Sequence, residues 1–266
     1  MNVPAAVTYA ARMTYADGYG RLIARHYDAI NAVLRGSSQD VAFYRALAQA
    51  SGGPVLELGC GTGRVLLPIA CDGVACVGVD ASRDMLDVFR AKGPPPNLEL
   101  VHAAMESFDL GSRRFRLITV PFRALSHLLD VPAQLAALAN VRRHLAPGGR
   151  LALDVFDPRL DRTALREEPE ALAASADTPR GKLQRFDRVT RDLARQVLTL
   201  RVRFVADAPE DSGEGELQLR WFYRYELEHL LARSGFTIER IYGGFDQRPW
   251  APGGETIMIA KRSNRP

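Results

Sequence analysis

A glycine-rich turn is the segment whose residue types and spacing indicate chemistry. Residues 55–58, Val-Leu-Glu-Leu, have the character of a short buried strand, residues 59–63, Gly-Cys-Gly-Thr-Gly, form a turn, and Arg64 begins a helical stretch. Glycine allows strained dihedral angles and lets a ligand approach the backbone without meeting a Cβ atom. Asp80 ends the next predicted strand, where a carboxylate can accept hydrogen bonds from ribose hydroxyls. The spacing predicts a nucleoside-binding site at the carboxyl edge of a parallel sheet.

The details of this turn favour S-adenosylmethionine over a nicotinamide dinucleotide. The glycines follow Gly-x-Gly-x-Gly rather than Gly-x-Gly-x-x-Gly, and Glu57 stands just before them. A cationic ligand tolerates these nearby carboxylates, and without a pyrophosphate the helix N-terminus has less to hold. A generic glycine turn and a nicotinamide dehydrogenase stay as alternatives, which a nicotinamide-binding test would separate.

Short apolar strands alternate with helices through most of the chain, which indicates βαβ units and a parallel sheet covered on both faces. The expected fold class is α/β: a Rossmann-like, doubly wound, seven-stranded, mostly parallel sheet. The predicted strands are 54–58, 75–79, 98–101, 115–120, 150–156, 236–242 and 255–261, and the predicted helices are 64–71, 82–91, 132–145 and 225–234.

Two further regions flank this core. Apolar residues at helical spacing between residues 17 and 50 predict two amphipathic helices, broken at residues 36–38. Residues 158–180 are interpreted as a helical or loop connection, and residues 182–189, 196–205 and 215–223 as antiparallel strands. The expected organisation is an N-terminal helical lid (1–50), a core (51–157 and 224–266) and a β-rich insertion (158–223) before the last helix.

Three motifs occur in the order typical of one enzyme family. Glu57-Leu58-Gly59-Cys60-Gly61-Thr62-Gly63 is followed by residues 77–82, Val-Gly-Val-Asp-Ala-Ser, with Met85-Leu86, and then by residues 145–149, Leu-Ala-Pro-Gly-Gly. On these motifs, residues 55–156 resemble the core of class I S-adenosylmethionine-dependent methyltransferases. The resemblance implies that Gly59 and Gly61 approach the methionine part of the cofactor, that Asp80 holds its ribose, and that S-adenosylhomocysteine is the product.

The resemblance also implies a wider cofactor-binding set. Its members are Tyr27, Glu57, Gly59, Cys60, Gly61, Gly63, Asp80, Ala81, Met85, Ala104, Met105 and Pro121. One position departs from the family pattern, because Ala103-Ala104-Met105 stands where many members have Gly-Asp-Met, whose acid binds the adenine amino group. The backbone near Ala104, the Met105 side chain packing on the ring, or Glu106 or His102 would take its place.

The segment after the fourth predicted strand narrows the acceptor. Val120-Pro121-Phe122 carries neither the Asn/Asp-Pro-Pro-aromatic motif of DNA amino-methyltransferases nor the Pro-Cys of cytosine C5 enzymes. It resembles the small-molecule branch that includes glycine N-methyltransferase-like and amino-sugar N,N-dimethyltransferases. The resemblance implies a small-molecule acceptor, methylated at an amine nitrogen rather than at oxygen. A small-molecule O-methyltransferase, a nucleic-acid methyltransferase and a non-catalytic S-adenosylmethionine-binding protein stay as alternatives.

His127 and Tyr27 are the catalytic candidates. His127 has an unperturbed pKa near ~6.5 and is a candidate general base, or else a residue that orders its loop. By the resemblance, the His26-Tyr27-Asp28 segment belongs to the lid, where Tyr27 touches the cofactor or packs the helix. Tyr15 and Tyr19 lie in the same presumed lid, and Tyr19 is a candidate substrate-binding residue.

Arginines supply the remaining substrate-binding candidates. Arg123 would bind an acidic group of the substrate or lie solvated at a rim. Between residues 180 and 203 the insertion is basic, and Arg201 and Arg203 are candidates for attracting an anionic substrate. A solvated sheet face or a homodimer surface explains the same charges.

Composition bounds the remaining partners. The chain has 266 residues, of which 47% are hydrophobic and 25% charged, so wholesale disorder is excluded. The net charge of +4 comes from basic residues interleaved with acids, which argues against a nucleic-acid partner. No apolar run is long enough to span a membrane. The N-terminus has no signal-peptide pattern, and neither the three cysteines nor the histidines have metal-ligand spacing. No metal and a cytoplasmic location are therefore expected.

Overall fold

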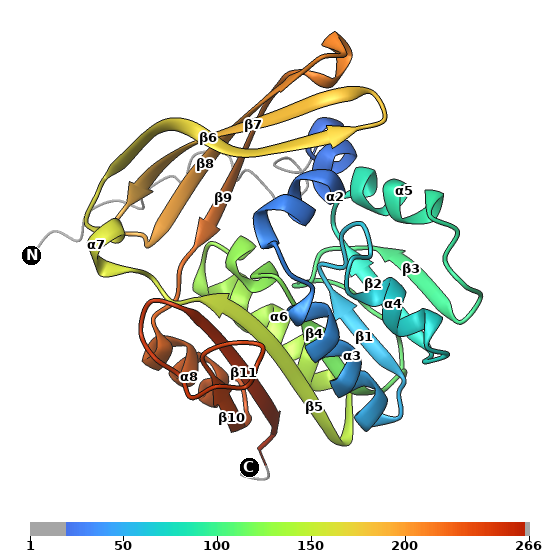
Figure 1. Ribbon diagram of the computed structural model, residues 1–266. Coiled ribbons are helices and arrows are strands. Elements are labelled where there is room, and N and C mark those ends of the chain that lie inside the picture. The colour runs from blue at the N-terminus through green and yellow to red at the C-terminus, as the bar shows by residue number, and fades with distance from the viewer. Residues whose placement is uncertain (1–19, 264–266) are drawn as a thin grey trace, which may run out of the picture.

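Two β-sheets organise the computed structural model, which describes residues 20–263. The larger has seven strands in the order β10-β11-β5-β4-β1-β2-β3, and the smaller has four in the order β6-β7-β8-β9. Figure 1 shows the smaller sheet at the top of the view, beyond the ends of the larger sheet's strands, with α2 between the small sheet and the core. No helix among these residues is both long and apolar enough to cross a membrane.

The seven-stranded sheet is parallel except for β11, which runs antiparallel to both β5 and β10. Its strands are β1 (Val55–Leu58), β2 (Cys76–Asp80), β3 (Leu98–His102), β4 (Phe115–Val120), β5 (Leu145–Phe156), β10 (Phe236–Tyr242) and β11 (Glu255–Arg262). Strand β1 pairs with β2 on one side and β4 on the other, so the strand order reverses at β1. Ligands of open α/β sheets bind beyond the carboxyl ends of the strands at such a switch point. The predicted fold class is confirmed.

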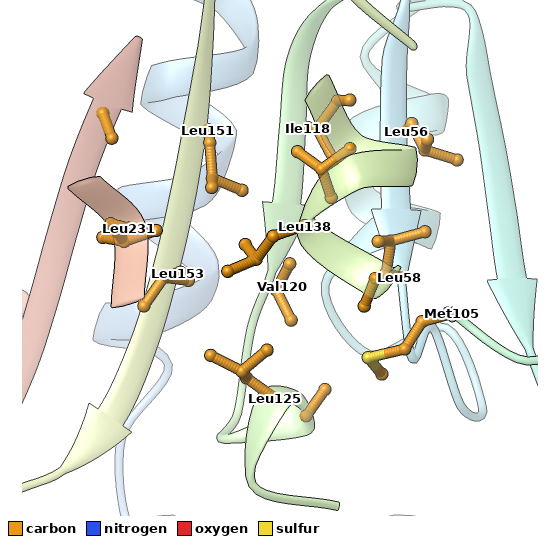
Figure 2. Packing of buried hydrophobic residues seen from close by; sticks show 14 of the residues in the cluster. Leu56, Leu58, Met105, Ile118, Val120, Leu125, Leu138, Leu151, Leu153 and Leu231 are labelled. Atoms are coloured by element: carbon orange, nitrogen blue, oxygen red, sulfur yellow. The ribbon is translucent and has the colours of Figure 1, made fainter. Parts of the chain in front are cut away.

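Helices cover both faces of this sheet, so every residue of β1 and β2 is buried. On one face α6 (Val131–His144) and α8 (Arg224–Arg233) pack into one apolar cluster. Within it, Leu138 of α6 lies between Val120 of β4 and Leu153 of β5 (Figure 2). On the other face α3 (Gln39–Ser51), α4 (Leu66–Cys71) and α5 (Arg83–Ala91) contribute to a second cluster.

One boundary differs from the sequence prediction. Helix α6 ends at His144, and β5 begins at Leu145 rather than at Arg150. Leu145 pairs with Phe115 of β4, and the register then shifts before Leu117 pairs with Arg150. The Pro-Gly-Gly segment therefore belongs to an irregular start of β5 instead of to a separate loop.

The smaller sheet is antiparallel and corrects a second prediction. Its strands are β6 (Glu167–Thr178), β7 (Gly181–Asp192), β8 (Val197–Ala206) and β9 (Gly213–Arg220). Residues 158–180, expected as a helical or loop connection, contain only the short α7 (Leu160–Thr163) before β6. Alanine has little β-propensity, but Ala174 and Ala176 of β6 pack in one cluster with Ile23 and Ala24 of α2. Packing against a helix therefore outweighs local preference in this strand.

Helix α2 (Arg21–Arg35) fills the space between the small sheet and the core. The break predicted at residues 36–38 is present, with Gly36 in the left-handed conformation. The α2 cluster also includes Met85 of α5, whose side chain is fully buried. The short helix η1 (Ala124–His127) follows β4 and contacts β9.

Candidate active site

The glycine turn is held by Asp80. Gly61 N donates to Asp80 Oδ2 at 2.7 Å, and Ser82 N donates to Asp80 Oδ1 at 2.8 Å. The carboxylate is 1% exposed, and it ties the turn after β1 to the start of α5. A carboxylate has about four acceptor positions, so Asp80 belongs to a class of side chain that can accept from amides and from ribose hydroxyls together. That role for Asp80 stays a prediction.

Each of the three glycines of the turn is needed for its own physical reason. All have positive φ, at 70°, 54° and 85° for Gly59, Gly61 and Gly63. A Cβ on Gly63 would lie 2.3 Å from the Phe89 ring, and one on Gly59 would lie 2.7 Å from the Ala124 Cβ. Among the described residues no atom outside its chain neighbours lies within 4 Å of the Cβ position of Gly61. Gly61 therefore leaves room for a ligand, whereas Gly59 and Gly63 are required by packing.

Glu57 and Cys60 are buried beside this turn. Burial raises the pKa of Glu57 to about 8, partly opposed by the Arg64 guanidinium and by a hydrogen bond from Thr119 Oγ1 at 3.3 Å. Glu57 is therefore largely protonated at neutral pH in the free protein. Burial also raises the pKa of the Cys60 thiol, which packs against Gly78, so the thiol is unreactive.

Helix α2 is attached to the glycine turn through Asp28. Thr62 Oγ1 donates to Asp28 Oδ1 at 2.7 Å, and Lys92 Nζ lies 2.6 Å from Asp28 Oδ2. The neighbouring Tyr27 meets the Phe122 ring edge-on, with 6.3 Å between centroids. Tyr27 thus contacts the segment after β4, and its roles at the cofactor and in catalysis stay predictions. Tyr15 and Tyr19 fall outside the described residues.

Two arginines that the sequence analysis missed lie over Phe122. The guanidinium carbons of Arg35 and Arg64 are 4.0 Å and 5.0 Å from the ring centroid. Both arginines pair with Asp40, which is 2% exposed, at 3.4 Å and 2.7 Å. Arg64 follows Gly63 directly and its position was a usable signal. Arg35 ends a helix far from any motif, and only the fold brings it here.

Residues 121–124 form a strained turn. Ala124 N donates to Pro121 O at 3.2 Å, and φ is 55° at Phe122 and 63° at Arg123. Left-handed conformations cost a non-glycine residue on the order of 1–3 kcal/mol each and gather at functional sites. Phe122 N and Arg123 N both donate to the Asp154 carboxylate, at 2.8 Å and 3.2 Å.

Asp154 is held in turn by Tyr44 of α3, whose hydroxyl donates to Oδ1 at 2.6 Å. Both side chains are buried. Burial, with Glu255 nearby, raises the pKa of Asp154, and burial beside Asp154 raises that of Tyr44. Neither residue was identified from the sequence. The available signal was Asp154 itself, an acid inside the apolar run 151–156, because buried acids are rare unless paired.

His127 has a different character from the one expected. Burial lowers its pKa to about 3, opposed by a hydrogen bond with the backbone of Gln218 in β9. This pKa lies below the unperturbed value because the insertion packs over η1, and the role of His127 as a general base stays a prediction. The imidazole is neutral at physiological pH and a weak base, and it joins η1 to the small sheet.

Arg123 is paired inside the protein. Its Nη2 lies 2.9 Å from Glu255 Oε1 of β11, and its guanidinium carbon is 5.1 Å from the centroid of the Phe156 ring. Its charge is therefore balanced before any substrate arrives, although its backbone belongs to the strained turn.

Arg201 and Arg203 do not reach this site. Their neighbours Leu200, Val202 and Phe204 pack on the α2 side of the small sheet, so the two arginines face the other way. Their partners are acids of the same sheet: Arg201 Nε lies 2.6 Å from Glu216 of the adjacent β9, and Arg203 Nε donates to Glu170 of β6, two strands away, at 3.1 Å. Further insertion pairs include Arg180–Glu210, Arg185–Asp187, Arg188–Glu167 and Arg191–Glu168. The role of this face as an anion attractor stays a prediction, and acids of β6 and β9 balance the charge of both arginines.

The residues expected near adenine lie where β2 and β3 end. His102 Nε2 is 2.9 Å from the Ala81 carbonyl oxygen. Met105 is buried, with its methyl group 3.8 Å from the Cβ position of Gly59, and Ala104 is half-buried. Met85 instead belongs to the apolar cluster that α2 forms with the small sheet. Its cofactor role stays a prediction for which packing offers a separate explanation.

This geometry can now be compared with known proteins. A family model described as "Methyltransferase domain" matches residues 55–149, the segment that contains the glycine turn, Asp80 and the turn after β4. Residues 55–149 form a methyltransferase domain. The recognition of the class I S-adenosylmethionine-dependent methyltransferases is confirmed, and S-adenosylmethionine is the cofactor of this domain.

The chain is also similar to individual methyltransferases, and in two of three cases along most of its length. It is 26% identical over 240 residues to the cypemycin N-terminal methyltransferase of Streptomyces sp, covering 89% of this chain and 94% of that protein. It is 33% identical over 100 residues, 38% of each protein, to dTDP-3-amino-3,6-dideoxy-alpha-D-glucopyranose N,N-dimethyltransferase of Streptomyces fradiae. The CcbJ methyltransferase of Streptomyces caelestis superposes with a TM-score of 0.80 and 25% identity, over 93% of this chain and 99% of that one.

The residues present fit this cofactor. Gly61 leaves space at the turn, beside the Asp80 carboxylate. Asp28 and Asp80 place carboxylates at the turn, which suits a ligand that carries a sulfonium and an ammonium, whereas the largely protonated Glu57 adds no charge in the free protein.

Proposed function

We propose that this methyltransferase transfers a methyl group to the amine nitrogen of a small-molecule acceptor. The cofactor, when bound, supplies a methyl group activated on a sulfonium. The protein then has to place a neutral nitrogen in line with that methyl group and keep water away. The turn at residues 121–124 is proposed as the wall that meets the acceptor, because it abuts the glycine turn where Ala124 approaches Gly59.

The observation that carries the choice of nitrogen is the hydrogen bond between His127 and the backbone of Gln218 in β9, which engages the imidazole within the protein. With its pKa lowered to about 3, the imidazole is a poor acceptor for the proton of a phenol or an alcohol. An amine that enters in its neutral form needs no base before attack. The named activities of the cypemycin and amino-sugar relatives, which are an N-terminal methyltransferase and an N,N-dimethyltransferase, also favour nitrogen.

The proposed roles follow from position. The Tyr27 and Phe122 rings would enclose the reacting groups, and Arg35 and Arg64 would hold Phe122 from its other face. Arg123 would meet the acceptor from the strained turn. A homodimer, an anionic acceptor and a cytoplasmic location stay as predictions. The proposal of an anionic acceptor has less support, because Arg201 and Arg203 form ion pairs with acids of the small sheet.

The first experiment is calorimetric titration of S-adenosylmethionine and S-adenosylhomocysteine into the wild type and Asp80→Ala. We expect binding by the wild type that is lost in Asp80→Ala and retained in Asp87→Ala, whose carboxylate lies on α5 and pairs with the exposed Arg90. A folded wild type that binds neither ligand would contradict the proposal.

The acceptor is then sought with three probes: a short peptide with a free N-terminus, dTDP-3-amino-3,6-dideoxy-α-D-glucose and a simple phenol. Mass spectrometry reports the gain of one methyl group for each. We expect transfer to an amine and none to the phenol. Transfer to the phenol alone would replace this proposal by O-methylation.

A further inference from the structure

The turn at residues 121–124 has a backbone that its own sequence does not favour. Turns with positive φ at both central residues are dominated by Asn and Gly, but here the central residues are Phe122 and Arg123. Neither side chain stabilises the left-handed region locally. Some other group must therefore hold the turn in this shape.

The Asp154 carboxylate is that group. Its two oxygens each accept one of the two consecutive amides, Phe122 N at 2.8 Å and Arg123 N at 3.2 Å. The Asp154 side chain is 0% exposed, so water does not compete for its oxygens. Because Asp154 lies within the buried part of β5, the turn takes its position from the central sheet.

Tyr44 of α3 holds the Asp154 carboxylate through its hydroxyl group. Its hydroxyl donates to Asp154 Oδ1 at 2.6 Å, and the two residues are 110 positions apart in sequence. The Tyr44 ring packs against Phe43 and Phe245, at 5.4 Å and 6.2 Å between centroids. A buried hydroxyl held in this way has few alternatives to Asp154 as acceptor.

We propose that Asp154 and Tyr44 are positioning residues for methyl transfer, with Asp154 setting the shape of the 121–124 turn and Tyr44 setting the carboxylate. The proposal rests on the proposed function, which assigns this turn to the acceptor. The turn places Phe122 against Tyr27 and Ala124 against Gly59. The bonds that hold the glycine turn to Asp80 do not involve it. Loss of Asp154 should thus separate methyl transfer from cofactor binding.

The test compares Asp154→Asn and Tyr44→Phe with the wild type in three measurements. The first is hydrogen–deuterium exchange in the segment that contains Phe122 and Arg123. The second is calorimetric titration with S-adenosylmethionine. The third is the single-turnover rate with whichever amine probe the wild type methylates.

In Asp154→Asn we expect exchange in this segment to be faster by about ten-fold or more, because a carboxamide cannot accept from both amides. The affinity for S-adenosylmethionine should stay within about two-fold, while the transfer rate falls by about 100-fold through misplacement of the acceptor wall. Tyr44→Phe keeps both amide bonds and should change exchange and rate in the same direction by a smaller factor.

Two variants serve as matched controls. Asp157→Asn alters another carboxylate near the end of β5 that accepts a backbone amide, from Gly253 at 2.8 Å. Tyr242→Phe removes a hydroxyl from the same aromatic cluster. We expect exchange near Phe122 and the transfer rate to be unchanged in both.

Unchanged exchange at Phe122 and Arg123 in folded Asp154→Asn would overturn the inference, as would a loss of cofactor affinity equal to the loss of rate. If Asp154→Asn does not fold, Tyr44→Phe decides, and wild-type behaviour in both exchange and rate would overturn the inference. A wild type that methylates no amine would count against the proposed function, whereas the exchange measurement would still decide whether Asp154 sets the turn.

Discussion

The glycine turn and the turn at residues 121–124 touch at Gly59 and Ala124, but they are built in opposite ways. The glycine turn obtains its shape from residue types within five consecutive positions and one carboxylate, Asp80. The neighbouring turn has unsuitable residues at its centre and obtains its shape from α3 and β5. A local motif can bind a cofactor that many enzymes have in common, whereas an acceptor site is assembled from distant segments.

The largest effect that would sharpen this comparison is expected inside the glycine turn. Gly63→Ala places a Cβ 2.3 Å from the Phe89 ring at a φ of 85°, so we expect a loss of about 3 kcal/mol of unfolding free energy from overpacking and strain together. Gly61→Ala, with open space around its Cβ position, should lose only about 1–2 kcal/mol from strain. Urea unfolding of both variants measures the difference, and equal losses would contradict the packing role of Gly63.

The buried acid beside the glycines should make stability fall as pH rises. The folded-state pKa of Glu57, about 8, lies above its ordinary 4.5, so the folded state holds a proton that the unfolded state releases between these values. The stabilisation is complete below pH 4.5 and is lost as pH rises through 8, by at most about 1.4 kcal/mol per pH unit. Glu57→Gln should flatten this dependence in urea unfolding followed from pH 5 to pH 9. The same slope in both proteins would show that Glu57 ionises freely.

His127, on the acceptor side, should give the opposite dependence at lower pH. Its folded-state pKa of about 3 lies below its ordinary 6.5, so the unfolded state binds the proton first. The stabilisation from neutral His127 is present above pH 6.5 and is lost as pH falls toward 3. His127→Gln should be less sensitive to acid than the wild type over this range. Its pH–rate profile should keep the wild-type shape, and loss of a step near pH 6.5 would restore His127 as a general base.

The smallest effect is expected on the outer face of the small sheet. Arg201→Glu and Arg203→Glu each break an exposed ion pair and put two acids side by side, so the melting temperature should fall slightly. Because both side chains face away from α2 and the core, the KM for the methylated acceptor should not change. An increase in KM would return the anion-attracting face to consideration.

The sequence predicted what depends on local pattern. The strand and helix order of the core, the break at residues 36–38 and the seven-stranded sheet are all confirmed. Strand β6 was missed because Ala174 and Ala176 have no strand preference of their own and gain their place under α2. The start of β5 was missed because a Pro-Gly-Gly segment ordinarily ends an element.

At the site, the same division holds. Asp80 and the glycines were identified because their roles follow from backbone geometry in a contiguous motif. The lowered pKa of His127 was not predicted because the packing of β9 over η1 has no local signature. Tyr44, Asp154 and Arg35 were missed because each acts through a residue more than thirty positions away. Alternation along the strand predicts which residues share a face with Arg201. It does not predict which face of the sheet meets α2.

Helix α2 connects the small sheet to the glycine turn. Ile23 and Ile30 pack on the small sheet, while Asp28 of the same helix accepts from Thr62 in the glycine turn. A chimaera that replaced only residues 158–223 with the corresponding segment of a relative would leave these isoleucines against a foreign surface. Helix α2 and the small sheet therefore form one packing unit. Recombination that cuts between them should yield chains that keep the cofactor motif but lose the packing of α2 on the small sheet.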